Sequence, residues 1–393
     1  MRQARDGIAG LIQPARPGWA SKRTVPLIVT DTAPTVASLA AELAAISTRP
    51  WTLMEVCGGQ THAIVRWGLD QLLPPGMTLI HGPGCPVCVT PAATIDAALA
   101  LAARPEVILC SYGDMLRVPG SGAASTDGSD DLLGVRAAGG DVRLLTSPLQ
   151  ALALAREHPQ RQVVFLAVGF ETTAPATALL ARQALALGVP NLSLLCAHVR
   201  VVPAMEAILA DPAVGVQGFL AAGHVCAVTG LEELEVLVAR RRVPVVVSGF
   251  APLEIMAALV ACVRRLEAGE AVVANAYGHV VRHGGNPEAR DLLAEVFEPV
   301  DRPWRGFGSV AGGGLALRPP YNQLDACLRF ALPDPAAAPE PATACIAAAV
   351  LQGRATPADC PAFGTTCTPE RPLGAPMVSS EGACAAWYRY RRR

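Results

Sequence analysis

The feature that most constrains the fold is the alternation of short apolar runs with longer helical patterns. The runs have the length and composition of buried strands, and they lie at residues 51–56, 78–80, 107–110, 142–145, 163–168, 192–195, 218–221 and 243–247. Amphipathic helical patterns separate several of them, for example at residues 92–103, 176–187 and 253–267. Continuous apolar strands between such helices are typical of parallel sheets covered on both faces. The chain is therefore predicted to have an α/β fold.

Length and local composition suggest how this fold is divided. At roughly 150 residues per domain, 393 residues correspond to two or three domains. We predict a flexible N-terminal tail over 1–22, α/β domains over 23–140 and 141–310, and a small irregular C-terminal domain over 311–393. The glycine-rich stretches 120–140 and 306–314 are expected to be loops, and the proline-rich stretch 333–341 is expected to be a linker.

Composition excludes several classes of protein. The one lysine, Lys22, has neither the context of a P-loop nor that of a Schiff-base lysine. A formal net charge of −1 argues against nucleic-acid binding, which needs a basic surface. No secretory signal is visible, and no apolar run reaches the roughly 18–20 residues of a membrane span. We therefore expect a cytoplasmic protein, in which clustered members of the 12 cysteines are ligands or redox groups.

Unusual residues directly follow the predicted strands. Because ligands bind at the carboxyl ends of strands in open α/β sheets, these residues predict one polar crevice. Cys57 is expected to be a reactive thiol or metal ligand oriented by His62, the alternative being a buried cysteine beside a turn. Glu171 is a general base, a hydrogen-bond partner of a bound metal group, or a solvated loop carboxylate. His198 and His224 follow later strands and are expected to be structural histidines.

Cys85 and Cys88 form a Cys-Pro-Val-Cys pair just before a predicted helix, with Thr90 as its N-cap. Because the N-terminus of a helix stabilises a thiolate, this context favours a reversible redox dithiol. Half of a zinc site and a pair of inert thiols are the alternatives. Four other cysteines lie on apolar patterns and are expected to pack in the core: Cys110, Cys196, Cys226 and Cys262.

The C-terminal region contains widely spaced cysteines, Cys345, Cys360, Cys367 and Cys384, with Cys327 as a spare upstream. Zinc sites favour closely spaced pairs, which these intervals do not match. Four thiolates in a compact segment also suit a [4Fe–4S] cluster. The spacing therefore favours an iron–sulfur cluster, and a zinc ion remains the alternative.

Together these motifs resemble one family, the HypD family of [NiFe] hydrogenase maturation factors. The matching stretches are MEVCGGQTHAI (54–64), HGPGCPVC (81–88), GFETTAP (169–175) and CPAFGTTCTPERPLGAPMVSSEGACAAWY (360–388). The resemblance covers nearly all of the chain after residue 25. It implies two α/β domains that face a cleft, the first with the CGGQTH and CPVC motifs and the second with GFETTAP, followed by a C-terminal [4Fe–4S] domain.

The resemblance also implies a function. Such a protein is a scaffold, rather than a conventional turnover enzyme, on which an iron ion receives cyanide and carbon monoxide to form the Fe(CN)2CO moiety. The small chaperone HypC would share the iron with Cys57, and HypE would deliver the cyanide. Cys85 and Cys88 would relay electrons from the cluster, and Glu171 would line the cleft. Cys360, Cys367 and Cys384 match the family's cluster ligands.

Cys345 departs from the family pattern. The family's register places Ala347, and not Cys345, where the first cluster ligand is expected. Two residues on a helix rotate a side chain by about 200°. Cys345 therefore suits the cluster only if this segment is irregular or the helix begins later. An alternative function is that of an iron–sulfur thiol–disulfide reductase acting through Cys85 and Cys88, and a third is that of a structural zinc protein.

Overall fold

Two parallel β-sheets form the framework of the computed structural model, which describes residues 33–122, 130–333 and 344–391. The predicted α/β fold with parallel sheets is thus confirmed. The predicted N-terminal tail, 1–22, and residues 334–341 of the predicted linker lie outside the described residues.

The first sheet has the strand order β2-β1-β7-β8-β9, with every neighbouring pair parallel. Its strands are β1 (Thr52–Glu55), β2 (Thr78–His81), β7 (Gly218–Ala222), β8 (Val245–Ser248) and β9 (Val273–Asn275). Successive side chains alternate between its faces. Leu53 and Leu220 pack against α1 (Val36–Ile46) and α11 (Pro252–Ala268), whereas Met54 and Phe219 pack against α8 (Val201–Ala210) and α10 (Glu232–Arg241).

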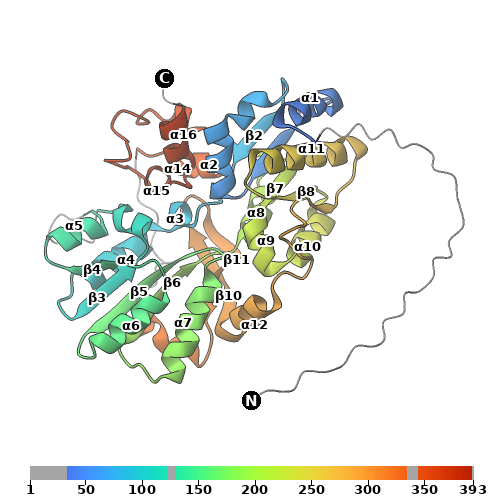
Figure 1. Cartoon of the computed structure of the whole chain (residues 1–393). Helices are drawn as coiled ribbons and strands as arrows, with labels where there is room; N and C mark the ends of the chain where they lie inside the picture. Colours follow the sequence, from blue (N-terminus) through green and yellow to red (C-terminus); the bar gives the residue numbers. More distant parts are fainter. Residues whose placement is uncertain (1–32, 123–129, 334–343, 392–393) are drawn as a thin grey trace, which may run out of the picture. The chain divides into compact units, whose positions relative to one another are not determined.

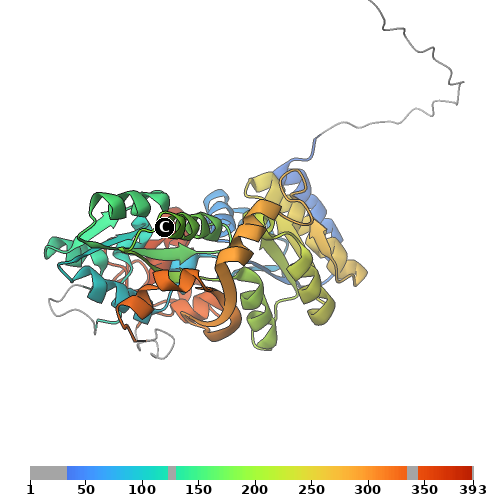
Figure 2. The same cartoon turned by 90° about the horizontal axis from the view of Figure 1, so that it is seen from below.

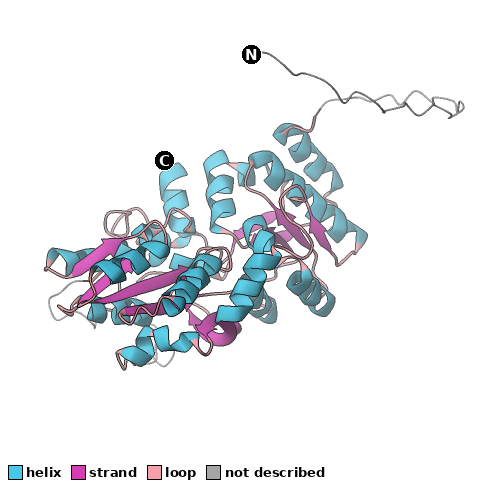
Figure 3. Cartoon of the chain, turned by 60° about the horizontal axis from the view of Figure 1, so that its bottom comes forward, coloured by secondary structure: helices cyan, strands magenta, loops and turns pink. Residues whose placement is uncertain are grey.

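The second sheet has the order β4-β3-β5-β6 and is also parallel. Its strands are β3 (Val107–Ser111), β4 (Asp141–Leu144), β5 (Gln162–Gly169) and β6 (Leu192–His198). One face packs on α6 (Leu149–Glu157) and α7 (Ala174–Ala186), and the other on α4 (Ala92–Ala102) and α5 (Leu132–Ala137). Figure 3 shows helices on both sides of the strands, as the apolar runs predicted.

The predicted division at residue 140 does not follow the sheets. β3 precedes residue 140 but pairs with β4 and β5, and β7 to β9 return to pair beside β1. Segments far apart in sequence therefore lie side by side, as the blue β1–β2 region and the yellow-green β7–β8 region do in Figures 1 and 2. Apolar periodicity identifies strands but not their partners, so it could not predict which strands share a sheet.

A β-hairpin occupies the stretch predicted as a flexible loop over 306–314. Its strands, β10 (Phe297–Trp304) and β11 (Gly308–Leu317), are antiparallel. A glycine that suggested flexibility is instead required for close packing, because a Cβ at Gly314 would lie 2.3 Å from Nε of Arg302. The Arg302 guanidinium crosses this space and donates hydrogen bonds to the carbonyl oxygens of Cys196 (2.7 Å) and Leu315 (2.9 Å).

Short helices replace other expected loops. Within the stretch 120–140, α5 begins after Asp131, whose side chain accepts the N–H of Gly134 at 2.8 Å. The remaining helical segments are α2 (Gly58–Trp67), η1 (Leu69–Leu72), α3 (Pro86–Val89), η2 (Gly113–Arg117), α9 (Gly223–Thr229), α12 (Pro287–Val296), η3 (Tyr321–Leu324), α13 (Ala326–Arg329), α14 (Ala347–Leu351), η5 (Pro357–Asp359), α15 (Ala375–Val378) and α16 (Ala383–Tyr390). In the C-terminal segment, α16 packs on α2 and α15 packs on α3 (Figure 1).

Candidate functional site

The site is built where β1 and β2 end. Cys57 is the N-cap of α2 and is almost fully buried, and the loop after β2 presses against it. A Cβ on Gly84 would lie 2.2 Å from the Cys57 nitrogen, so only glycine fits there. The N–H of Gly58 donates to the Gly84 carbonyl oxygen at 2.8 Å. This contact brings the Cys57 and Cys85 loops together, as the strand-end motifs predicted.

A buried carboxylate, Glu55, holds these loops in place. Its Oε2 accepts the backbone N–H of Cys57 at 2.8 Å. Its Oε1 accepts the hydroxyl of Thr61 in α2 and lies 2.8 Å from Nδ1 of His81 at the end of β2. Glu55 is fully buried and His81 is 9% exposed. One side chain therefore ties together β1, β2 and the first turns of α2.

The histidine beside the Cys57 sulfur is His224, whose Nδ1 lies 3.6 Å from Sγ. Burial lowers the pKa of His224 to about 4, so its imidazole is neutral near pH 7. Burial raises the pKa of the Cys57 thiol, and the charges of Glu55 and Glu381 raise it further, against the opposing effect of the Gln60 N–H. Cys57 is thus a neutral thiol here, and it would lose its proton on binding a cation.

His62 does not have the position predicted for it. Its Nδ1 lies 3.0 Å from the Ser380 carbonyl oxygen, and its Nε2 lies 3.2 Å from the hydroxyl of Tyr390. Both ring nitrogens are therefore engaged with the C-terminal segment and not with the Cys57 thiol. Nearness in sequence misled the prediction, because α2 turns His62 away from its N-cap, whereas His224 arrives from the end of β7.

Cys85 and Cys88 are joined by a disulfide, with their Cα atoms 5.2 Å apart. Cys85 is itself the N-cap of α3, and α4 begins only after Pro91, so the predicted N-cap role of Thr90 is wrong. Both cysteines are buried in the same apolar cluster as Cys57. The chain thus places a disulfide-forming pair next to a single buried thiol, and the reversibility of that pair stays a prediction.

Glu171 is buried and is not a solvated loop carboxylate. It is 4% exposed, and its Oε1 accepts the N–H of Val201 at 3.0 Å. Burial raises its pKa to about 7, against the opposing effects of the backbone N–H groups of Glu171 and Val201 and of the Arg200 charge. His198 is also buried, with Nε2 3.0 Å from the Thr177 hydroxyl, which agrees with a structural role.

The predicted core cysteines are mostly buried. Cys110 and Cys262 are fully buried and Cys226 is 3% exposed, whereas Cys196 is only partly buried. Burial raises the pKa of Cys110, Cys226 and Cys262 to about 12 in each case. Inert packing is therefore the role that their surroundings favour.

The cysteines of the C-terminal segment lie near one another. Burial raises the pKa of Cys384, and charges on Cys345, Cys367 and Cys360 raise it further. Cys345 precedes α14, which begins at Ala347 after the N-cap Ile346, so the helical rotation that counted against it does not apply. Within the described residues, no three His, Cys, Asp or Glu side chains are placed to hold one metal ion.

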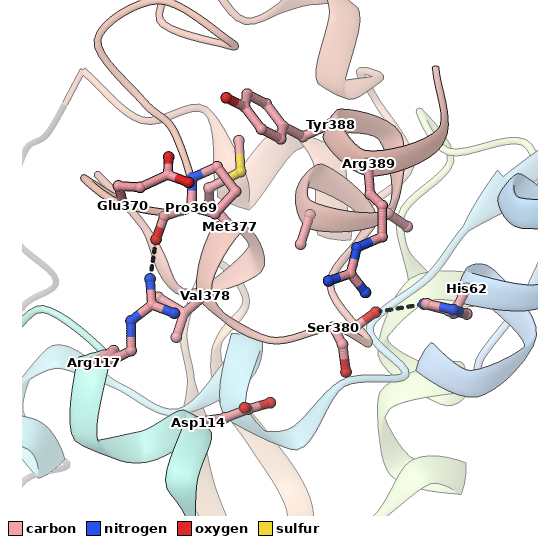
Figure 4. A pocket seen from close by; sticks show the side chains of 12 residues that line it. His62, Asp114, Arg117, Pro369, Glu370, Met377, Val378, Ser380, Tyr388 and Arg389 are labelled. Atoms are coloured by element: carbon pink, nitrogen blue, oxygen red, sulfur yellow. Dashed lines mark hydrogen bonds between the residues drawn. The ribbon is translucent and has the colours of Figure 1, made fainter. Parts of the chain in front are cut away.

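The C-terminal segment also meets α2 around a cavity of about 380 Å³ (Figure 4). His62 and Ser380 form one of its edges, and Arg117, which donates to the Pro369 carbonyl oxygen, forms another. Next to it, a Cβ on Gly58 would lie 2.4 Å from Cβ of Glu381. Three residues of this region were not predicted as site residues, although each lies within one of the matching motifs: Glu55, His81 and Glu381.

The fold and the site define a class of α/β protein. In this class a buried thiol lies beside a disulfide and near a cysteine-rich C-terminal segment. None of the helices in the described part of the chain has the length and apolar character needed to span a bilayer. The sequence model of HypD, described as the hydrogenase formation hypA family, matches residues 34–391. The chain belongs to the HypD family, and its role is in hydrogenase maturation.

Individual relatives agree with this assignment. The chain is 46% identical over 367 residues to the hydrogenase maturation factor HypD of Azotobacter vinelandii, covering 91% of this chain and 95% of that protein. It is 47% identical to the hydrogenase expression/formation protein HupD of Azotobacter chroococcum, with the same coverages. It is 44% identical to HypD of Escherichia coli K12, covering 90% of this chain and 93% of that protein.

Proposed function

We propose that this protein is the scaffold on which the Fe(CN)2CO moiety of [NiFe] hydrogenase is assembled. The observation that carries the proposal is the burial of Cys57 beside a neutral histidine and a disulfide-forming pair. A soft thiolate suits low-spin Fe(II), which binds cyanide and carbon monoxide strongly. In this proposal the iron is cargo, Cys57 is its protein ligand, and a HypC-type chaperone supplies a further ligand.

The thiol pair and the C-terminal cysteines have supporting roles in this proposal. Reduced Cys85 and Cys88 release two electrons and two protons when they form their disulfide, so they can reduce a ligand donor brought by a HypE-type partner. Cys345, Cys360, Cys367 and Cys384 would hold a [4Fe–4S] cluster, which supplies one-electron transfer when bound. Their donor set fits, because burial and the neighbouring cysteines raise the pKa of Cys345 and Cys384, so that these thiols would ionise only beside a compensating cation.

The proposed cluster does not conflict with the spacing of these cysteines. In a [4Fe–4S] cluster each thiolate binds a different iron, so the sulfurs surround the cluster instead of converging on one ion.

We place this assembly in the cytoplasm. The near-neutral chain carries no charge excess for nucleic acid, so the expected partners are proteins.

Infrared spectroscopy tests the scaffold directly. The anaerobically purified complex of this protein with its small chaperone is expected to show bands of metal-bound cyanide and carbon monoxide. Protein expressed without the cyanide-donating partner serves as the control and should lack the cyanide bands. A complex that supports hydrogenase maturation in cells but shows no such bands would contradict the proposed cargo.

Metal analysis tests the proposed cluster. Anaerobically purified protein is expected to contain about four cluster irons and four sulfides per chain. Cys345→Ala and Cys384→Ala should lose this iron to the same extent, whereas the control Cys327→Ala should keep it. Zinc in place of iron would exclude the cluster, and full iron content in Cys345→Ala would exclude that residue as a ligand.

A further inference from the structure

A second cavity, of about 290 Å³, lies where α9, α10 and α12 meet the hairpin of β10 and β11 (Figure 1). Its apolar side consists of Leu293 and Ala294 from α12 and of Phe297, Pro299 and Leu315 from the hairpin. This volume is just below the range of roughly 300–1,000 Å³ that is usual for ligand pockets. The cavity therefore has room for a small ligand with an apolar body.

The polar side of this cavity contains two ion pairs. Nη2 of Arg200 lies 2.6 Å from Oε1 of Glu233, and Nη2 of Arg290 lies 2.7 Å from Oε2 of Glu232. Each arginine uses its other terminal nitrogen to donate to a backbone carbonyl oxygen, at Gly312 and Gly284 respectively. The charge of each of these two guanidinium groups is therefore paired with a glutamate, so neither supplies an uncompensated positive charge for a ligand.

Two polar groups at the cavity are not satisfied in this way. Oε2 of Glu171 is buried, and it has no hydrogen-bond partner among the described residues. The same holds for Nε of Arg318, which follows β11. In the described part of the chain Arg318 has no acidic partner. Buried polar groups without partners are costly, so a pair of them at one cavity points to a missing ligand.

The charges at the cavity indicate what that ligand is. When Glu171 is protonated, three arginines and two charged glutamates line the cavity, which leaves one net positive charge. The arginines are Arg200, Arg290 and Arg318, and the glutamates are Glu232 and Glu233. Because the N–H of Val201 occupies Oε1 of Glu171, the proton lies on Oε2, and this oxygen becomes a donor. A planar anion with two acceptor oxygens matches one guanidinium and one hydroxyl. A dianion such as phosphate would exceed the available charge.

We propose that this cavity is a binding site for a monocarboxylate with a short apolar body, held by Arg318 and Glu171. The carboxylate accepts hydrogen bonds from the Arg318 guanidinium and from the protonated Glu171. The apolar body packs on Leu293, Phe297 and Leu315. The carboxylate belongs either to a small organic acid or to the C-terminus of a polypeptide, whose preceding residues can extend into the adjoining groove beside Arg200 and Val236.

Binding should weaken as the pH rises. The charged and titratable groups around Glu171 are Arg200 before α8, Cys226 of α9, Glu232 and Glu233 of α10, Arg290 of α12 and Arg318 after β11. The pKa of Glu171 is raised to about 7, chiefly by burial. Above this value Glu171 loses the donor proton and repels the carboxylate, so affinity should fall about tenfold between pH 6 and pH 8.

Calorimetric titration of the anaerobically purified full chain with 3-methylbutanoate tests the site. We expect binding at pH 6, the tenfold loss at pH 8, and no binding of the neutral 3-methylbutanamide. Acetyl-Ala-Ala-Val with a free carboxylate, compared with its C-terminal amide, distinguishes the sources. Tighter binding of the free peptide than of 3-methylbutanoate indicates a polypeptide C-terminus, and weaker binding indicates a small acid. Equal binding of acid and amide overturns the proposal.

Two variants test whether Arg318 and Glu171 bind the carboxylate. Arg318→Gln should lower affinity by about tenfold or more, because it removes the uncompensated cation. Glu171→Gln, which stays neutral, should bind with the same affinity at pH 6 and pH 8. Arg282→Gln, which changes an exposed arginine, is the matched control. Unchanged affinity in Arg318→Gln, or a tenfold pH effect that persists in Glu171→Gln, contradicts the site.

Discussion

Replacing Cys57 with serine is expected to abolish hydrogenase maturation while leaving the fold intact. The variant keeps the size of the side chain and the N-cap position but removes the soft thiolate donor. Loss of a metal ligand should reduce maturation more than about 100-fold, beyond the effect of losing an outer-shell partner. Maturation is measured as hydrogenase activity in cells that lack the native gene for this protein and express the variant instead. The infrared bands of the chaperone complex should disappear as well.

A control is needed to show that burying a hydroxyl group does not by itself abolish maturation. Cys262→Ser introduces the same change at a fully buried cysteine of α11, and it should support maturation if the protein folds. Thermal unfolding of both variants shows whether stability is preserved. Normal maturation in Cys57→Ser together with complete loss in Cys85→Ser would refute the scaffold and favour the thiol–disulfide reductase.

Replacing Glu55 with alanine is expected to lower the free energy of unfolding more than any other substitution proposed for this protein. The change removes the acceptor for the Cys57 N–H, the Thr61 hydroxyl and His81 together, and it leaves buried donors without partners. Because each buried donor left without an acceptor costs about 1–3 kcal/mol, the free energy of unfolding should fall by roughly 3 kcal/mol or more. Anaerobic denaturant unfolding, followed by circular dichroism, measures this difference.

The matched control for Glu55 is an exposed glutamate. Glu270→Ala, just beyond α11, should change the free energy of unfolding by less than about 0.5 kcal/mol. Glu55→Gln, which keeps the shape of the side chain, should cost less than Glu55→Ala because an amide oxygen still accepts from the Cys57 N–H. If Glu55→Ala were as stable as Glu270→Ala, the carboxylate would not be what ties the two strand ends together.

The strands were predictable and their partners were not. Residues buried on both faces of a sheet leave apolar runs in the sequence, so β1 to β8 were found close to their observed positions. Pairing depends on contacts between distant segments, such as Leu53 with Gly218, which no local pattern encodes. The hairpin escaped detection because Gly313 and Gly314, needed for close packing, read as flexibility.

The site was predictable to the same extent. The rule that ligands bind at strand ends brought Cys57 and Cys85 together correctly, since parallel strands end at one edge. Sequence neighbours gave the wrong histidine, because His62 lies on α2 and reaches Ser380, whereas His224 comes from the end of β7. The carboxylate of Glu55 was missed because a residue within a predicted strand is expected to pack and not to organise a site.

The order of the strands affects how this protein emerges from the ribosome. All strands of the second sheet have been made once His198 is synthesised, so this sheet can form while the rest of the chain is still being translated. The strand that leads to Cys57 must wait for β7, which begins at Gly218, and His224 follows only after that. A chain that ends before His224 therefore cannot present the assembled thiol site, and the proposed iron would not be bound before more than half of the residues have been made.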